Sequence, residues 1–285
     1  MKERHSTKSL QKKEITSSVF QSDSFHIKYW IGGQGPTLVF IHGFGGNALI
    51  SWEEELAHFA KTNTVVAYDL LWFGESYSNK IANLTTQTNA LYSLLSYLKI
   101  DQATLVGQSY GGFVALNFAH SHPEMIEKLF IANSPGSTFD VSYLDSVCKV
   151  YNTNSIDELF VIVEPAGIQR LINLTTYSDK QIPNFLLKQM FAAYFDQNHE
   201  QMKSLMQSLP VDQNRIRDVS SIQKIPTLVL WGENDELFPK KEGEKFAKAI
   251  DAQFISIPEC GHAPQIDDHE SFLKILDNFI LDNHQ

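Results

Sequence analysis

Short runs of apolar residues alternate with helix-like segments along most of this chain. Six of these runs lie at Thr37–Ile41, Thr64–Tyr68, Ala103–Val106, Lys128–Ala132, Thr227–Leu230 and Gln253–Ile257. They lack the polar alternation of a half-exposed strand, which indicates strands buried on both faces of a parallel sheet. Two further strands, Ile15–Phe20 and Phe25–Ile31, are predicted to open the chain as a hairpin. The pattern predicts an α/β fold with a mainly parallel sheet flanked by helices.

Helical spacing of apolar side chains fills the segments between these runs. We expect helices at Thr85–Leu98, Gly111–His120 and Asp267–Leu281. Ser51 and Glu54 have the spacing of a capping box, which predicts that another helix begins there.

The alternation stops between about Gly136 and Ser220, where helical patterns follow one another without strands. We expect one helix that begins at Ser155 and ends at Pro165, a second with Pro183 near its start, and a third, His199–Leu209, that is ended by Pro210. A helical insert in an α/β core is typical of a cap or lid. The predicted organisation is a core of residues 15–135 and 221–285, a cap of residues 136–220, and a flexible N-terminal arm of residues 1–14.

Charge and composition exclude several classes of function. Lysine and arginine number 23 against 33 aspartates and glutamates, a net charge of −10, whereas nucleic-acid binding requires a basic surface. The same balance argues, more weakly, against an anionic membrane surface. Two cysteines far apart in the sequence do not predict a disulfide framework or a zinc site. No apolar stretch approaches 18 residues and no apolar run follows the basic start, so we expect no membrane span, no secretory signal and a cytoplasmic location.

The sequence Gly107-Gln-Ser109-Tyr-Gly111 joins a predicted strand directly to a predicted helix. This is the G-x-S-x-G pattern in its strand–turn–helix context, which predicts a sharp turn that exposes the hydroxyl group of Ser109. The glycines are expected because side chains at positions 107 and 111 would clash in that turn. A helix N-terminus beside the hydroxyl also favours developing negative charge. Ser109 is therefore the candidate nucleophile.

A serine nucleophile requires a base, and the base requires an acid that orients it. Asp235 and His262 each follow a predicted strand by a few residues, in the chain order serine, aspartate, histidine. Because the carboxyl ends of parallel strands meet at one edge of a sheet, we expect these two side chains to lie near Ser109. Glu233 and Glu236 flank Asp235 and are the alternative candidates for the acid.

A glycine-rich loop, His42-Gly43-Phe44-Gly45-Gly46, follows the first buried strand. Such a loop turns backbone N–H groups towards the carbonyl oxygen under attack. We expect an oxyanion hole formed by the N–H groups of Phe44 and of Tyr110, the residue after the nucleophile.

These motifs together resemble the α/β-hydrolase superfamily, in its branch with a serine nucleophile, over nearly the whole chain beyond the first dozen residues. A further match is Asp69–Ser76, which looks like the family's Asp-x-x-Gly-x-Gly-x-Ser loop with Trp72 in place of the first glycine. The resemblance implies an eight-stranded sheet and a helical cap over the active site, between the sixth and seventh strands.

Three groups within that family look most similar: esterases, monoacylglycerol-lipase-like enzymes and the meta-cleavage-product hydrolases, which cleave C–C bonds. Haloalkane dehalogenases and epoxide hydrolases have an aspartate nucleophile, so Ser109 disfavours those activities. Meta-cleavage hydrolases usually have tryptophan directly after the catalytic histidine, where this chain has Ala263, and their substrates are anionic. Arg170 is the one arginine in the cap before residue 215.

These residues predict hydrolysis of a carboxylic ester of small to medium size through an acyl-enzyme, with no metal or organic cofactor required. Apolar side chains are expected to bind the substrate, namely Trp72, Phe191, Tyr194 and Phe195. The alternatives are a C–C bond hydrolase with the same triad, and a ligand receptor without turnover on the same scaffold. The expected partner is a small-molecule ester, with no nucleic acid and no membrane span, and the chain is expected to be a monomer or a homodimer.

Overall fold

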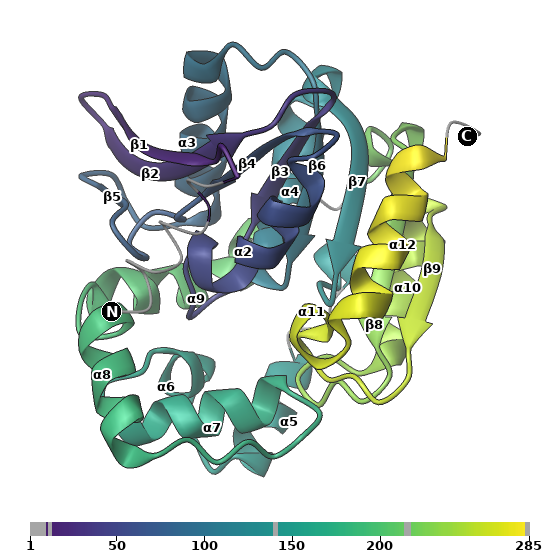
Figure 1. Ribbon diagram of the computed structural model, residues 1–285. Coiled ribbons are helices and arrows are strands. Elements are labelled where there is room, and N and C mark those ends of the chain that lie inside the picture. The colour runs from purple at the N-terminus through teal and green to yellow at the C-terminus, as the bar shows by residue number, and fades with distance from the viewer. Residues whose placement is uncertain (1–9, 11–12, 139–141, 214–217, 283–285) are drawn as a thin grey trace.

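The computed structural model describes residues 10, 13–138, 142–213 and 218–282, and contains one large twisted sheet (Figure 1). Along the sheet the strand order is β1-β2-β4-β3-β6-β7-β8-β9, and the two-residue strand β5 (Tyr77–Ser78) pairs with β2. The strands are β1 (Thr16–Gln21), β2 (Phe25–Gly32), β3 (Thr37–Ile41), β4 (Thr64–Tyr68), β6 (Ala103–Gln108), β7 (Ile126–Ala132), β8 (Thr227–Gly232) and β9 (Gln253–Ile257). The eight predicted strands are all present.

Strand direction follows the burial pattern of the sequence. The hairpin of β1 and β2 and the pairing of β2 with β4 are antiparallel, whereas every pair from β4 to β9 is parallel. The strands β6 and β8 are each buried at all six positions, as expected for strands covered on both faces. The prediction of a mainly parallel sheet with an opening hairpin is confirmed.

Helices cover both faces of the sheet (Figure 1). On one face α2 (Ala48–Phe59) and α12 (His269–Leu281) contribute Leu56, Phe59, Phe272 and Leu276 to a shared apolar core. On the other face lie α3 (Leu84–Leu98), α4 (Tyr110–Ser121) and α10 (Lys240–Ile250), whose apolar side chains join the larger core cluster. The short helix α11 (Pro264–Asp267) precedes α12.

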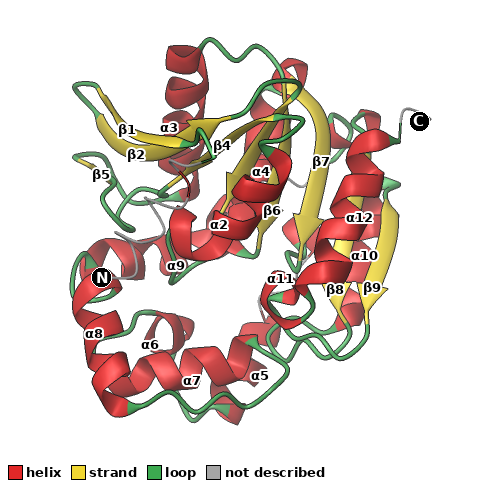
Figure 2. Ribbon diagram, in the orientation of Figure 1, coloured by secondary structure: helices red, strands yellow, loops and turns green. Residues whose placement is uncertain are grey.

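Between β7 and β8, the described residues form helices and loops without a strand (Figure 2). These helices are α5 (Ser142–Val150), α6 (Ile156–Phe160), α7 (Pro165–Thr175), α8 (Asn184–Tyr194) and α9 (His199–Gln213). They lie beyond the carboxyl ends of the parallel strands (Figure 1). Their apolar side chains, such as Leu159, Leu171 and Leu205, belong to the larger core cluster, so this cap packs as part of the core.

Three predicted helix ends are wrong. Helix α2 begins at Ala48, because the side chain of Asn47 accepts a hydrogen bond from Ile50 N at 2.9 Å and caps the helix before Ser51. Pro165 begins α7 instead of ending the preceding helix, since a proline at the first helical position lacks only an N–H group that has no partner there. Helix α9 continues through Pro210 to Gln213, and the proline lies in its last turn.

Most of the predicted N-terminal arm, residues 1–9 and 11–12, lies outside the described residues. Leu10 is buried, and its carbonyl oxygen accepts hydrogen bonds from Lys13 N and Ile15 N. Both cysteines, Cys148 and Cys260, are buried and free. In the part of the chain that the structure describes, no helix is long and apolar enough to cross a membrane.

Candidate active site

Ser109 lies on a sharp turn between β6 and α4. Its backbone has φ +53° and ψ −119°, a strained conformation for a residue with a side chain. A Cβ atom on Gly107 would overlap backbone atoms of Gly111, and one on Gly111 would overlap the carbonyl oxygen of Ile41. The two glycines are therefore needed for close backbone packing, and Ser109 projects from the turn that they allow.

Three buried side chains form a continuous chain of hydrogen bonds at the carboxyl edge of the sheet. Ser109 Oγ lies 2.7 Å from His262 Nε2, and His262 Nδ1 lies 2.9 Å from Oδ2 of Asp235. Asp235 and His262 come from the loops after β8 and β9, respectively. The geometry matches a nucleophile, a base and an orienting acid. The alternative acids lie elsewhere: Glu233 pairs with Lys240, and Glu236 accepts a hydrogen bond from Tyr151.

The carboxylate of Asp235 has four hydrogen-bond donors. Oδ1 accepts from Leu237 N and Phe238 N, both at 2.9 Å. Oδ2 accepts from His262 and also from Asn133 Nδ2 at 2.7 Å. Four hydrogen bonds to one carboxyl group fix its orientation. The loop therefore holds the buried carboxyl group directly against Nδ1 of the imidazole.

Two residues of this network were missed in the sequence. Asn133 follows β7 directly, has φ +47°, and also accepts a hydrogen bond from Gly232 N through Oδ1. Gln108 precedes the nucleophile and donates from Nε2 to the carbonyl oxygen of His262 at 3.0 Å. Both lie at the carboxyl ends of central strands, and that position is the one feature of the sequence that could have indicated them.

Phe44 and Tyr110, the predicted oxyanion donors, lie beside Ser109 and line the same cavity with it. Their rings meet edge to face with centroids 5.8 Å apart. Tyr110 is the first residue of α4, so its N–H group has no acceptor within the helix. Both residues are thus near the hydroxyl group that would attack a carbonyl carbon.

The loop that contains Phe44 is stabilised by hydrogen bonds of a neutral histidine, His42. His42 Nδ1 donates to the carbonyl oxygen of Gly43 at 2.7 Å, and Nε2 accepts from Leu70 N at 2.9 Å. Complete burial lowers the pKa of His42 to about 4, against a smaller opposing effect of the hydrogen bond to Gly43. His42 therefore stays uncharged near neutral pH and joins the loop of Phe44 to the Asp69–Ser76 loop.

Two apolar cavities meet at Ser109. The small cavity has a volume of about 30 Å³ and is lined by Phe44, Ser109, Tyr110, Phe113, Leu144, Ile156, Phe160, Met206, Leu209, Leu237 and Phe238. The large cavity has a volume of about 300 Å³, and its lining includes Gly43–Gly46, Ser109, His262, Ala263, Gln265, Ile168, Leu171, Ile172, Met190 and Phe195. Cap helices α5, α6 and α9 contribute to the small cavity, and α6 to α8 to the large one.

Of the residues predicted to bind substrate, Phe195 lines the large cavity, whereas Trp72, Phe191 and Tyr194 line neither. Trp72 is buried in the core, and its indole N–H donates to the carbonyl oxygen of Ser78 at 3.4 Å. Its φ of +69° lies in the region that favours glycine, the residue more common at this position in the family that the sequence resembles. Phe191 and Tyr194 are half-buried and pack against the core.

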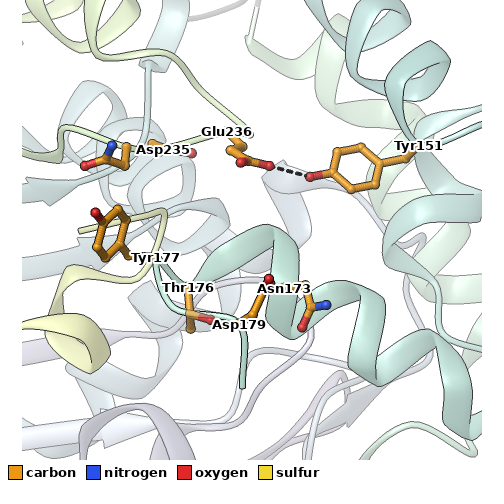
Figure 3. Close-up of a pocket in the computed structure, with 8 residues that line it drawn as sticks. Tyr151, Asn173, Thr176, Tyr177, Asp179, Asp235 and Glu236 are labelled. Carbon is orange, nitrogen blue, oxygen red and sulfur yellow. Dashed lines mark hydrogen bonds between the residues drawn. The ribbon is translucent and has the colours of Figure 1, made fainter. Parts of the chain in front are cut away.

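A third, polar cavity of about 540 Å³ lies between the cap and the loop that carries Asp235 (Figure 3). The hydroxyl group of Tyr151, just beyond α5, donates to Glu236 at 2.7 Å across one side of it. Burial raises the pKa of Tyr151, and its bond to Glu236 raises it further. Tyr151 therefore stays protonated, and its hydrogen bond connects the cap to the loop that carries Asp235.

Positive charge is scarce around Ser109. Lys180 is exposed and, among the residues that the structure describes, is the one lysine or arginine that lines either apolar cavity. Arg170 lines neither, and its guanidinium donates to the carbonyl oxygen of Glu158. Among the described residues, no group of three or more histidine, cysteine, aspartate or glutamate side chains is arranged to hold a metal ion.

Residues 36–269 match the family model of the alpha/beta hydrolase fold. The chain belongs to the alpha/beta hydrolase family. Within it, the chain is 29% identical over 266 residues to a 2-hydroxymuconate semialdehyde hydrolase of Pseudomonas sp. (strain CF600), covering 88% of each chain. It is also 27% identical over 266 residues to an uncharacterized protein of Mycobacterium tuberculosis (strain ATCC 25618 / H37Rv), covering 88% of this chain and 76% of that one.

Solved structures of other alpha/beta hydrolases have the same fold. A putative lipase from Acinetobacter baumannii AYE superposes with a TM-score of 0.83 at 19% identity, covering 98% of this chain and 95% of that one. A meta-cleavage product hydrolase from Pseudomonas fluorescens IP01 gives a TM-score of 0.74 at 21% identity, covering 91% and 97%. These similarities establish a hydrolase fold that is shared by lipases and C–C bond hydrolases.

Proposed function

We propose that this alpha/beta hydrolase cleaves a carboxylic ester of small to medium size and apolar character. The observation that carries the proposal is the buried chain of hydrogen bonds from Ser109 through His262 to Asp235, placed where two apolar cavities meet. An apolar cavity with a few convergent polar groups suits a neutral ester.

In the proposed mechanism Ser109 Oγ attacks the ester carbonyl carbon while His262 Nε2 takes the hydroxyl proton. Asp235 holds the other ring nitrogen and stabilises the imidazolium that forms. The N–H groups of Phe44 and Tyr110 stabilise the negative charge on the carbonyl oxygen. His262 then gives its proton to the leaving alcohol, and a water molecule, deprotonated by the same nitrogen, releases the acid from Ser109.

A C–C bond hydrolase of meta-cleavage products is the second candidate, because the 2-hydroxymuconate semialdehyde hydrolase is 29% identical to this chain. Three features favour the ester instead. Ala263 follows His262, Arg170 lies outside both apolar cavities, and Lys180 is exposed at the edge of the large one. A dianionic substrate would place a second negative charge in a largely apolar site, where the described residues include no buried cation to pair with it.

Turnover of p-nitrophenyl esters by the wild type and by Ser109→Ala tests the proposal. We expect the wild type to release p-nitrophenol and the variant to lose at least about 1,000-fold in kcat, since loss of a nucleophilic serine removes the acyl-enzyme route. Equal rates would refute it. Turnover of a ring-opened 2-hydroxy-6-oxodienoate without turnover of any ester would support the second candidate. Binding of a ligand without turnover of either substrate would support a receptor role.

A further inference from the structure

The small and large cavities touch different members of the candidate active site. Ser109 lines both, so a carbonyl carbon bonded to its Oγ would lie between them. His262 lines the large cavity but not the small one, whereas Tyr110, Phe113 and Leu237 line the small one alone. The two cavities are therefore not equivalent in the proposed ester hydrolysis.

The chemistry of acyl transfer assigns one part of an ester to each side. In the tetrahedral intermediate the carbonyl carbon carries the serine oxygen, the oxyanion, the acyl substituent and the leaving oxygen. When the C–O bond breaks, the leaving oxygen must receive the proton held on His262 Nε2, so it must lie on the side that His262 lines. The oxyanion points to the N–H groups of Phe44 and Tyr110. The acyl substituent is then directed into the small cavity.

The size and walls of the small cavity limit what this substituent can be. About 10–15 Å³ of such a cavity holds one water-sized group, so a volume of about 30 Å³ accommodates roughly two. Phe113 and Leu237, each 1% exposed, form fixed walls from the core. Met206 and Leu209 of the cap helix α9 form the other side and are also buried.

We propose that this enzyme selects esters with a short acyl group of two or three carbons, and that the bulk of the substrate is the apolar alcohol. The alcohol lies in the large cavity, against Met190, Phe195 and Leu171. Met206 is then a residue that determines acyl specificity, and Met190 one that determines alcohol specificity. This assignment rests on the proposed ester hydrolysis and adds which part of the ester lies in each cavity.

Two series of substrates test the assignment. In the first series, p-nitrophenyl acetate, butyrate and octanoate vary the acyl group, and kcat/KM is expected to fall at least about tenfold from acetate to octanoate, because overfilling a packed cavity is destabilising. In the second series the acyl group is always acetyl, and the alcohol grows from ethanol to hexanol to 2-phenylethanol. There kcat/KM is expected to rise as more apolar surface is buried in the large cavity.

Met206→Ala and Met190→Ala form a matched pair, since the same side chain is shortened on the two sides of Ser109. Met206→Ala should raise the octanoate-to-acetate ratio of kcat/KM at least about fivefold. It should leave the ratios of kcat/KM between the alcohols of the second series unchanged. Met190→Ala should change the ratios of kcat/KM between the alcohols of the second series and leave the octanoate-to-acetate ratio unchanged. Thermal unfolding of both variants shows that they are folded, and Leu209→Ala replaces Met206→Ala if the latter is not.

Each result separates the assignment from the proposed function. Ester turnover by the wild type with octanoate preferred over acetate would overturn the assignment and keep the ester chemistry. An exchange of the effects of the two methionine variants would overturn the assignment in the same way. No turnover of any ester in either series would refute the ester chemistry, and the assignment with it.

Discussion

Asn133 Nδ2 lies 2.7 Å from Oδ2 of Asp235, the same oxygen that accepts the hydrogen bond from His262 Nδ1. The amide group can only donate here, because its Oδ1 accepts from Gly232 N. A donor on that oxygen stabilises the carboxylate and keeps it directed at the imidazole. We therefore predict that Asn133 acts on the proposed base through Asp235, as a positioning residue.

Replacement of Asn133 by glycine tests this role without backbone strain, since φ at this position is +47° and glycine adopts that region freely. Loss of a charge-assisted hydrogen bond of about 1.5–3 kcal/mol is expected to lower kcat roughly 10- to 100-fold with little change in KM. Steady-state kinetics on an ester that the wild type cleaves measures both constants. A kcat within twofold of the wild type would rule out the positioning role.

Asp267 joins the cap to the loop of the candidate base. Its Oδ2 accepts hydrogen bonds from Gly261 N at 2.8 Å, directly before His262, and from Tyr177 N at 2.9 Å in the cap. The cap also accepts a hydrogen bond from Ala263 N through the carbonyl oxygen of Thr175. Asp267→Ala is expected to lower kcat/KM about tenfold, because both the imidazole and the wall of the large cavity lose a support.

Asp268 offers the matched control, since its side chain caps α12 by accepting a hydrogen bond from Ser271 N at 3.0 Å. Asp268→Ala should cost about 1 kcal/mol of stability while kcat/KM stays near the wild type. Asp267→Asn retains an acceptor oxygen and should restore most of the activity. If Asp267→Ala and Asp268→Ala affected activity alike, Asp267 would be only a structural residue.

The strands and the chain order of the candidate triad could be predicted because they depend on local patterns. Buried parallel strands need continuous apolar runs, and a nucleophile turn needs glycines on both sides of Ser109. The roles of Ser109, Asp235 and His262 stay predictions, although the structure places the three side chains within hydrogen-bonding distance.

Features that depend on tertiary contacts could not be predicted. Asn47 and Ser51 are both residues of a type that can cap α2, and the helix begins after Asn47. There Asp69 Oδ1 also accepts a hydrogen bond from Ala48 N. Trp72 lines neither apolar cavity, which depends on how distant segments pack. The contact of Asn133 with Asp235 likewise joins segments far apart in the chain. A local pattern places Asn133 at the end of a strand, but it does not contain these tertiary contacts.

His42 predicts a specific loss of stability in acid. Burial lowers its pKa to about 4 in the folded chain, against an ordinary value of 6.5, so the unfolded chain binds a proton first as the pH falls. The contribution of neutral His42 to the free energy of unfolding is fully present above pH 6.5 and is lost progressively down to about pH 4. Between pH 7 and pH 5 the free energy of unfolding should fall by about 2 kcal/mol from this group alone.

Urea unfolding of the wild type and of His42→Gln at pH 7 and pH 5 isolates the effect. The amide of glutamine does not titrate, so the variant should lose about 2 kcal/mol less than the wild type between the two pH values, although it is less stable at pH 7. A parallel pH dependence of the two proteins would contradict the assignment to His42.

His269 predicts the opposite trend at higher pH. It lies at the start of α12, with Nδ1 3.4 Å from the buried carboxyl of Glu55 and Nε2 3.1 Å from Glu54, both on α2. The close contact with the Glu55 carboxyl, more than the longer-range charges of Glu55 and Glu54, raises the pKa of His269 above its ordinary 6.5, against the opposing effect of burial. Its stabilising contribution is fully present below pH 6.5 and is lost as the pH rises through the folded pKa.

Burial also raises the pKa of Glu55, and the contact with the His269 imidazole only partly offsets this shift. Deprotonation of His269 at alkaline pH leaves this carboxyl without its cationic partner between α2 and α12, so the two shifts act in the same direction. The melting temperature of the wild type should exceed that of His269→Gln by more at pH 6 than at pH 8.5. An equal difference at both pH values would show that the imidazole stabilises the two helices without its charge.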